Sequence, residues 1–158
     1  MNKAIQLRQV TKTDKPRFGD LLQQYLGEDG GRVFAAPKNP DSSYSYPYFN
    51  LYWQEPTRFP FYIIDGNIVA GFVMIRQLSG DLYSIAEFYI LPDKRRSGIG
   101  RAAMNKVFET FPEKSWLISV IRQNKAAYDF WINIAENFTV PIELEIIEKQ
   151  RFHWPGKA

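Results

Sequence analysis

Apolar residues in the first part of the chain follow two periods, one typical of strands and one typical of helices. The run 4–10 predicts a strand, and the segment after it predicts a helix because its apolar side chains recur three or four residues apart. Thr11 or Thr13 can cap this helix, with Pro16 in its first turn. Glycine, proline, asparagine and serine dominate residues 27–43, so this stretch is predicted to be a loop.

A three-stranded meander is predicted in the middle of the chain. Residues 44–61 are dense in aromatic side chains and are expected to hold a short helix. Two apolar runs, 61–64 and 68–75, flank the turn Asp65-Gly66-Asn67, which is a hairpin signature. A second turn then leads into a third strand at 82–91.

Helices and strands alternate in the second half of the chain. The pattern predicts a helix from residue 99, a strand at 116–121, a helix at 125–136, and strands at 140–147 and 150–154. We find no internal repeat or linker, so one domain spanning residues 1–158 is expected. The order β-α-α-β-β-β-α-β-α-β-β is that of a mixed α/β fold.

Composition narrows the classes of protein to which this fold can belong. The chain has 158 residues, of which 45% are hydrophobic, which is enough for one core. It has no cysteine, which excludes disulfides, thiolate catalysis and cysteine-based zinc sites. No apolar run approaches the roughly 20 residues of a membrane span, and the first residues lack the apolar region of a signal peptide. We therefore expect a cytoplasmic protein that does not bind membranes.

The run from Glu87 to Arg101 carries the strongest chemical signal. An apolar strand ends at Pro92, a basic turn with glycine follows, and a helix starts beyond it. Such a helix start binds anions, because its N–H groups point outward, the dipole is positive there, and glycine permits close approach. The net charge is only +3, and basic residues gather at this one turn. A small polyphosphate therefore fits better than a nucleic acid, which needs a broader basic face.

This turn meets neither of two common phosphate-binding motifs in full. A P-loop needs Lys-Ser or Lys-Thr after its second glycine, where this chain has Arg101 and Ala102. The segment from Gly98 to Ala103 does match the dinucleotide fingerprint G-x-G-x-x-A. However, the acidic residue that should follow about 20 positions later is missing. The unit also follows a meander, which makes the dinucleotide fold a weaker hypothesis.

The sequence Arg95-Arg96-Ser97-Gly98-Ile99-Gly100 instead resembles the R-x-x-G-x-G acyl-CoA signature of the GNAT superfamily of N-acyltransferases. Downstream, Asn124, Ala127 and Trp131 resemble the N-x-x-A helix of that family and its aromatic residue. The resemblance implies a mostly antiparallel sheet of six to seven strands that splays in the middle, with flanking helices. It also implies acetyl-CoA as co-substrate, no metal, and transfer of the acetyl group to a primary amine of a small molecule or peptide.

The same resemblance implies roles for individual residues. Glu87 is expected either as the general base for the amine or as a structural carboxylate paired within the sheet. The CoA pyrophosphate would lie on the helix start, and the pantetheine amides would pair with the strand edge near Ile90. The expected cofactor-binding residues are Tyr89, Ile90, Leu91, Arg95, Arg96, Ser97, Gly98, Ile99, Gly100, Arg101, Asn124 and Trp131.

Three features leave alternatives open. Trp131 stands where the family frequently has a tyrosine that protonates the CoA thiolate, and indole is no useful acid. Tyr128, one turn earlier, is expected either to supply that proton or to pack in the core. Asn124 either caps its helix alone or also contacts pantetheine. Because of these alternatives, a second hypothesis stays open: the chain is a non-catalytic domain that binds acyl-CoA or a nucleotide.

The sequence does not identify the acceptor or the oligomeric state, and a homodimer is compatible with it. The aromatic stretch 44–53 is expected on the acceptor side, where it favours a substrate with an apolar part. His153, the only histidine, is expected to be structural or exposed.

Overall fold

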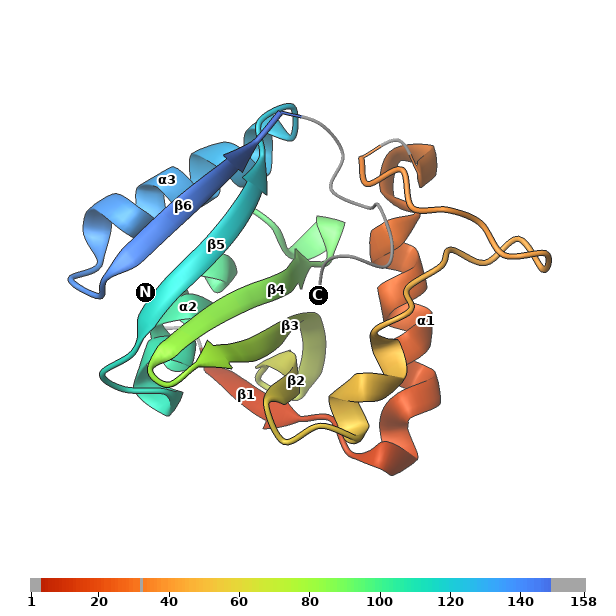
Figure 1. Ribbon diagram of the computed structural model, residues 1–158, viewed down its shortest axis with the longest axis horizontal. Helices are drawn as coiled ribbons and strands as arrows, with labels where there is room; N and C mark the ends of the chain where they lie inside the picture. Colours follow the sequence, from red (N-terminus) through yellow and green to blue (C-terminus); the bar gives the residue numbers. More distant parts are fainter. Residues whose placement is uncertain (1–3, 32, 149–158) are drawn as a thin grey trace.

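The computed structural model describes residues 4–31 and 33–148, which form one six-stranded sheet with the strand order β1-β2-β3-β4-β5-β6 (Figure 1). The strands are β1 (Ile5–Gln9), β2 (Arg58–Asp65), β3 (Ile68–Ser79), β4 (Leu82–Ile90), β5 (Ser115–Ile121) and β6 (Ile142–Ile147). The α-helices are α1 (Lys15–Leu26), α2 (Ile99–Thr110) and α3 (Lys125–Asn137). Short 3-10 helices are η1 (Lys12–Asp14), η2 (Glu28–Gly31), η3 (Phe49–Trp53) and η4 (Pro92–Lys94).

Helices cover both faces of the sheet, so each face has its own apolar core. On one face α1 and η3 pack around Phe18, Tyr62 and Phe72. On the other face α2 and α3 pack around Met104 and Trp116. Within the described residues, no helix is long and apolar enough to cross a membrane. Because both faces are covered, a polar side chain inside either layer is held in place by its neighbours.

Most of the predicted elements are confirmed. For β1, β4, β5 and α3, each predicted end lies within one residue of the observed end. The helix expected within 44–61 is the short 3-10 helix η3, whose Phe49 and Trp53 pack against Phe18 of α1. Neither predicted threonine caps α1, which begins after η1 with an N-cap that makes no side-chain hydrogen bond. The strand expected at 150–154 and His153 lie outside the described residues.

The sheet splits along one side of β4. The pairs β1–β2, β2–β3 and β3–β4 are antiparallel, whereas β4–β5 and β5–β6 are parallel. Pairing of β4 with β5 stops at Ile85 and Ile118, while β5 continues beside β6 as far as Ile121. The C-terminal ends of β4 and β5 therefore diverge (Figure 1), which confirms the expected splayed sheet.

A β-bulge stands where the split begins. Met74 of β3 pairs with Glu87, but the next residue, Ile75, pairs with Ile85, so Ala86 is an extra residue on β4. A bulge bends its strand and changes which face the following side chains occupy. Glu87 and Tyr89 consequently lie on the α1 face, opposite Phe88 and Ile90. Alternation predicts Ala86 on the Phe88 face, and this is wrong because the bulge turns it to the α1 face.

Gly71 permits a very close approach of β3 to β4 just beyond the bulge. A methyl group at Gly71 would lie 1.9 Å from the carbonyl oxygen of Tyr89. The neighbouring N–H of Leu91 donates to the carbonyl oxygen of Ala70 at 2.8 Å. Only glycine leaves room for this backbone packing, and it fixes the path of β4 along the split.

Candidate functional site

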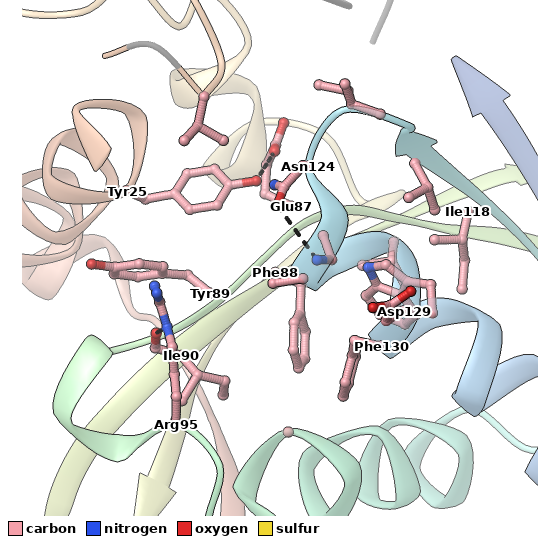
Figure 2. Close-up of a pocket in the computed structure, with 18 of the residues that line it drawn as sticks. Tyr25, Glu87, Phe88, Tyr89, Ile90, Arg95, Ile118, Asn124, Asp129 and Phe130 are labelled. Carbon is pink, nitrogen blue, oxygen red and sulfur yellow. Dashed lines mark hydrogen bonds between the residues drawn. The ribbon is translucent and has the colours of Figure 1, made fainter. Parts of the chain in front are cut away.

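A cavity of about 670 Å³ occupies the split between β4 and β5 (Figure 2). One wall is β4 from Ile85 to Ile90, and the other is β5 from Ile118 to Ile121. The basic turn, the first turn of α2 and one side of α3 as far as Asn133 complete the lining, together with a few side chains from the end of α1 and the loop after it. The cavity therefore extends from the buried side chain of Glu87 to the first turn of α2.

The first turn of α2 presents backbone N–H groups beside the cavity. Gly98 is the N-cap, with φ of 83° in the left-handed region and no side-chain capping bond. The first N–H groups of a helix have no partner within it, and the dipole is positive there. A methyl group on Gly98 would meet nothing within 4 Å, whereas one on Gly100 would lie 2.9 Å from the Phe130 ring. Gly98 thus allows the turn, and Gly100 allows α2 to approach α3 closely.

Arg95 links this basic turn to η2 and to the end of β4. Its guanidinium pairs with Glu28 at 2.8 and 3.0 Å, and its Nε donates to the carbonyl oxygen of Ile90 at 2.8 Å (Figure 2). Burial, and next the charge of Glu28, raises the pKa of the Tyr89 hydroxyl, which accepts a hydrogen bond from Gln24. The ion pair with Glu28 partly neutralises the positive charge of Arg95.

Glu87 is a buried carboxylate, with 3% of its surface exposed, yet it lines the cavity. The hydroxyl of Tyr25 donates to its Oε1 at 2.6 Å, and that of Tyr46 donates to its Oε2 at 2.9 Å (Figure 2 shows the Tyr25 bond). Hydrogen bonds to a charged group contribute about 1.5–3 kcal/mol each, so these two can hold a carboxylate in a buried place. Tyr25 comes from α1 and Tyr46 from the loop before η3.

Helix α3 forms the side of the cavity that faces β4. Asn124 caps the helix, since its side chain accepts a hydrogen bond from the backbone N–H of Ala127 at 3.4 Å. The Phe130 ring stacks on Phe88 at a centroid distance of 5.4 Å, and the buried Trp131 meets Phe88 edge-on at 5.2 Å. These aromatic contacts join α3 to β4 at the level where β4 and β5 no longer pair.

Most of the predicted cofactor-binding residues lie together in this cavity. The lining includes Tyr89, Ile90, Arg95, Arg96, Gly98, Gly100, Arg101, Asn124 and Trp131. Three others are absent from the described lining: Leu91 packs in the α1 core, Ile99 is buried in the α2 core, and Ser97 donates to the carbonyl oxygen of Lys94. Tyr128 is also absent from it, and its ring packs beside Arg122 at 5.8 Å.

The sequence prediction missed several residues of the site. Glu28, Tyr25 and Tyr46 lie far from the β4 motif in the chain, and no local pattern marks them as its partners. Phe88 lies on the face of β4 opposite Glu87 and also lines the cavity, because the split exposes the edge of β4. In the described part of the chain, no three histidine, aspartate or glutamate side chains lie close enough to hold a metal ion.

Comparison with known protein families gives one match for this chain. A model of the family described as Acetyltransferase (GNAT) family matches residues 19–132. No curated protein sequence matches the chain significantly.

Three solved structures illustrate the similarity of fold. An acetyltransferase of the GNAT family from Staphylococcus aureus Mu50 has a TM-score of 0.64, with 14% identity, and the match covers 82% of each chain. The PaiA N-acetyltransferase from Thermoplasma acidophilum, solved with coenzyme A, has a TM-score of 0.59 and 13% identity, covering 82% of this chain and 87% of that one. An aminoglycoside acetyltransferase from an uncultured soil metagenomic sample, solved with sisomicin, has a TM-score of 0.59 and 18% identity, covering 98% and 96%.

Proposed function

This chain belongs to the GNAT family of acetyltransferases, and from that premise we propose that it moves an acetyl group from acetyl-CoA to a primary amine. The observation that carries the proposal is the cavity between β4 and β5, which ends at the basic first turn of α2. Both requirements of an acyl-CoA ligand, an anion site and an exposed strand edge, meet in that one cavity. Residues 1–158 would act as one acyl-CoA-binding domain.

Acetyl-CoA would bind along the split. Its pyrophosphate would accept hydrogen bonds from the N–H groups at the start of α2, with positive charge supplied by Arg95, Arg96 and Arg101. Its pantetheine amides would pair with the edge of β4 near Ile90, as an added strand does. The thioester would then lie near Glu87. The structure of the Thermoplasma acidophilum neighbour contains coenzyme A, which supports a cofactor of this kind.

Glu87 would act as the general base of direct transfer. The amine nitrogen attacks the thioester carbonyl carbon, its proton passes to Glu87, and the C–S bond breaks to release the CoA thiolate. Because Tyr46 donates to Oε2, its hydroxyl can relay the proton: it receives one from the amine and gives its own to the carboxylate. A backbone N–H of β4 near Ile90 would polarise the carbonyl during the attack.

The leaving thiolate would depart without a proton donor from α3. Trp131 is buried and carries no acidic group, and the Tyr128 ring packs beside Arg122. Tyr128 is the proton donor that the sequence offers, so the variant Tyr128→Phe tests it directly. We expect unchanged turnover in this variant, and a large decrease would restore Tyr128 as the general acid.

Binding and chemistry are tested separately. Isothermal titration should show binding of acetyl-CoA to the wild-type protein and none to Gly98→Asp, which places a carboxylate at the pyrophosphate. Release of free thiol is then measured with a panel of amines. Acceptor-dependent release that is lost in Glu87→Gln, with acetyl-CoA binding retained, supports the reaction. Binding without any acceptor-dependent release would favour the non-catalytic acyl-CoA-binding domain, and no binding at all would refute both.

A further inference from the structure

Two arginines lie side by side on the face of the sheet that carries Glu87. Arg58 of β2 and Arg76 of β3 are direct cross-strand partners. The next pair along the same face joins Pro60 to Met74, and Met74 in turn is the partner of Glu87 on β4. Like charges at directly opposed positions of a sheet repel one another. An arrangement of this kind needs a negative charge from elsewhere.

The protein supplies only part of that negative charge. Glu55 pairs with Nε of Arg58 at 2.9 Å, but the Glu55 side chain is 44% exposed. The Arg58 side chain is 6% exposed, and its buried Nη1 has no hydrogen-bond partner. Arg76 is half-buried, and no carboxylate of the described residues lies within ion-pair distance of its guanidinium. Burial, and next the charge of Arg58, lowers the pKa of Arg76.

Tyrosines connect this arginine pair to Glu87. The guanidinium of Arg58 lies 5.6 Å from the ring centre of Tyr48 and 5.3 Å from that of Tyr52. Tyr48 contacts Tyr46 at a ring distance of 6.2 Å, and Tyr46 donates to Glu87. The hydroxyl of Tyr52 is also buried without a hydrogen-bond partner. A series of contacts thus leads from the Glu87 carboxylate through Tyr46 and Tyr48 to the guanidinium of Arg58, which lies beside Arg76.

Buried polar groups without partners are costly, and a ligand can supply the partners they lack. We infer that the acceptor amine carries an oxyanion, a carboxylate or a phosphate, which binds Arg76 and Arg58 while its amino group lies beside Glu87. A guanidinium group binds such an oxyanion through two parallel hydrogen bonds. The hydroxyl of Tyr52 is a third donor group beside the two arginines. A polycationic amine would instead meet two positive charges. This inference rests on the proposed acetyl transfer.

Matched pairs of acceptors test the inference. Thiol release from acetyl-CoA is measured with free amino acids against their C-terminal carboxamides, with phosphoethanolamine against ethanolamine, and with spermidine as a polycation. We expect kcat/KM for the anionic member of the best pair to be about tenfold to a hundredfold higher, the range expected for a charge-assisted hydrogen bond. Arg76→Gln should reduce this preference to nearly none, and Arg76→Lys should restore part of it.

Arg8→Gln is the control, because Arg8 lies on β1 on the same face of the sheet and the change removes the same charge. It should retain the full preference. Equal rates for both members of every pair, a preference for spermidine, or an unchanged preference in Arg76→Gln would each overturn the inference. Transfer to neutral amines at good rates would leave the proposed acetyl transfer intact.

A binding measurement keeps the inference testable without turnover. N-acetylated amino acids, which would be the products, and their carboxamides are titrated into the wild-type protein in the presence of CoA. Binding of the carboxylates that is lost in Arg76→Gln, with an unchanged circular dichroism spectrum, supports the anion site. Equal affinity for carboxylate and carboxamide would refute the anion site, whatever the thiol assay shows.

Discussion

Replacing Gly71 with alanine should damage both the stability and the cofactor site of this protein. The added methyl group would lie 1.9 Å from the Tyr89 carbonyl oxygen and 3.0 Å from the Cα of Ile90. Since ordinary contacts begin at 3.4 Å, the two strands must separate by about 1.5 Å at this point. The 2.8 Å bond from the Leu91 N–H to the Ala70 carbonyl oxygen would then stretch beyond hydrogen-bond range.

We expect Gly71→Ala to lower the free energy of unfolding by about 2–4 kcal/mol, from strain in a packed region and the broken backbone bond. For a domain of this size, the melting temperature should fall by about 5–15 °C. Urea and thermal unfolding followed by circular dichroism measure both values. Acetyl-CoA affinity, measured by titration on the folded variant, should also fall because the edge of β4 is displaced.

Gly66→Ala is the matched control, because Gly66 lies in the turn between β2 and β3 with φ of 64° and open space around it. Alanine there costs only the backbone strain of a left-handed residue, about 1 kcal/mol, and should not affect acetyl-CoA binding. If Gly71→Ala were no more destabilising than Gly66→Ala, the close approach of β3 and β4 would not shape the site as described.

Three further variants test other parts of the structure. Burial, and next the charge of Glu87, raises the pKa of Tyr52 to about 12 from 10.0. The folded state therefore favours the protonated hydroxyl. The resulting contribution to the free energy of unfolding is fully present below pH 10 and is lost as the pH rises to about 12. Across that window the wild-type protein should lose about 3 kcal/mol more stability than Tyr52→Phe in urea titrations, and parallel losses would contradict the raised pKa. Glu28→Gln should tighten acetyl-CoA binding severalfold and steepen its salt dependence, because Arg95 loses its carboxylate partner; weaker binding in calorimetry would show that Glu28 instead positions Arg95. Asn124→Ala should cost about 1 kcal/mol in thermal unfolding through loss of the α3 cap, and an unchanged melting temperature would argue against that role.

Local periodicity was sufficient to predict the helices and strands beside the site. Helices α2 and α3 bury regular apolar stripes, so their sequence spacing reflects their packing. The segment from 44 to 61 was harder, because its aromatic side chains serve contacts with α1 rather than a repeating helical face. Phe49 and Trp53, for example, both pack against Phe18. Tertiary contacts, not propensity, determine the backbone there.

The parts of the candidate site that escaped prediction depend on strand register. The bulge at Ala86 shifts the alternation of all the later residues of β4, and no residue type in 82–91 indicates it. Arg58 lies outside the strand predicted at 61–64, and its pairing with Arg76 depends on the register of β2 against β3. Glu28 meets Arg95 across 67 positions of sequence. Such contacts arise from the topology of the folded chain, and no local sequence pattern predicts them.

The split beside β4 also bears on how the protein avoids self-association. A strand edge without a neighbour is normally a template for another chain and a starting point for edge-to-edge aggregation. Here the edge beyond Ile85 faces a recess, and the stacked rings of Phe88 and Phe130 stand across it. Helix α3 covers this edge, which keeps a second sheet from pairing with it, whereas a linear molecule with amide groups can enter the recess. The fold can thus keep an unpaired edge for binding while denying it to other copies of itself.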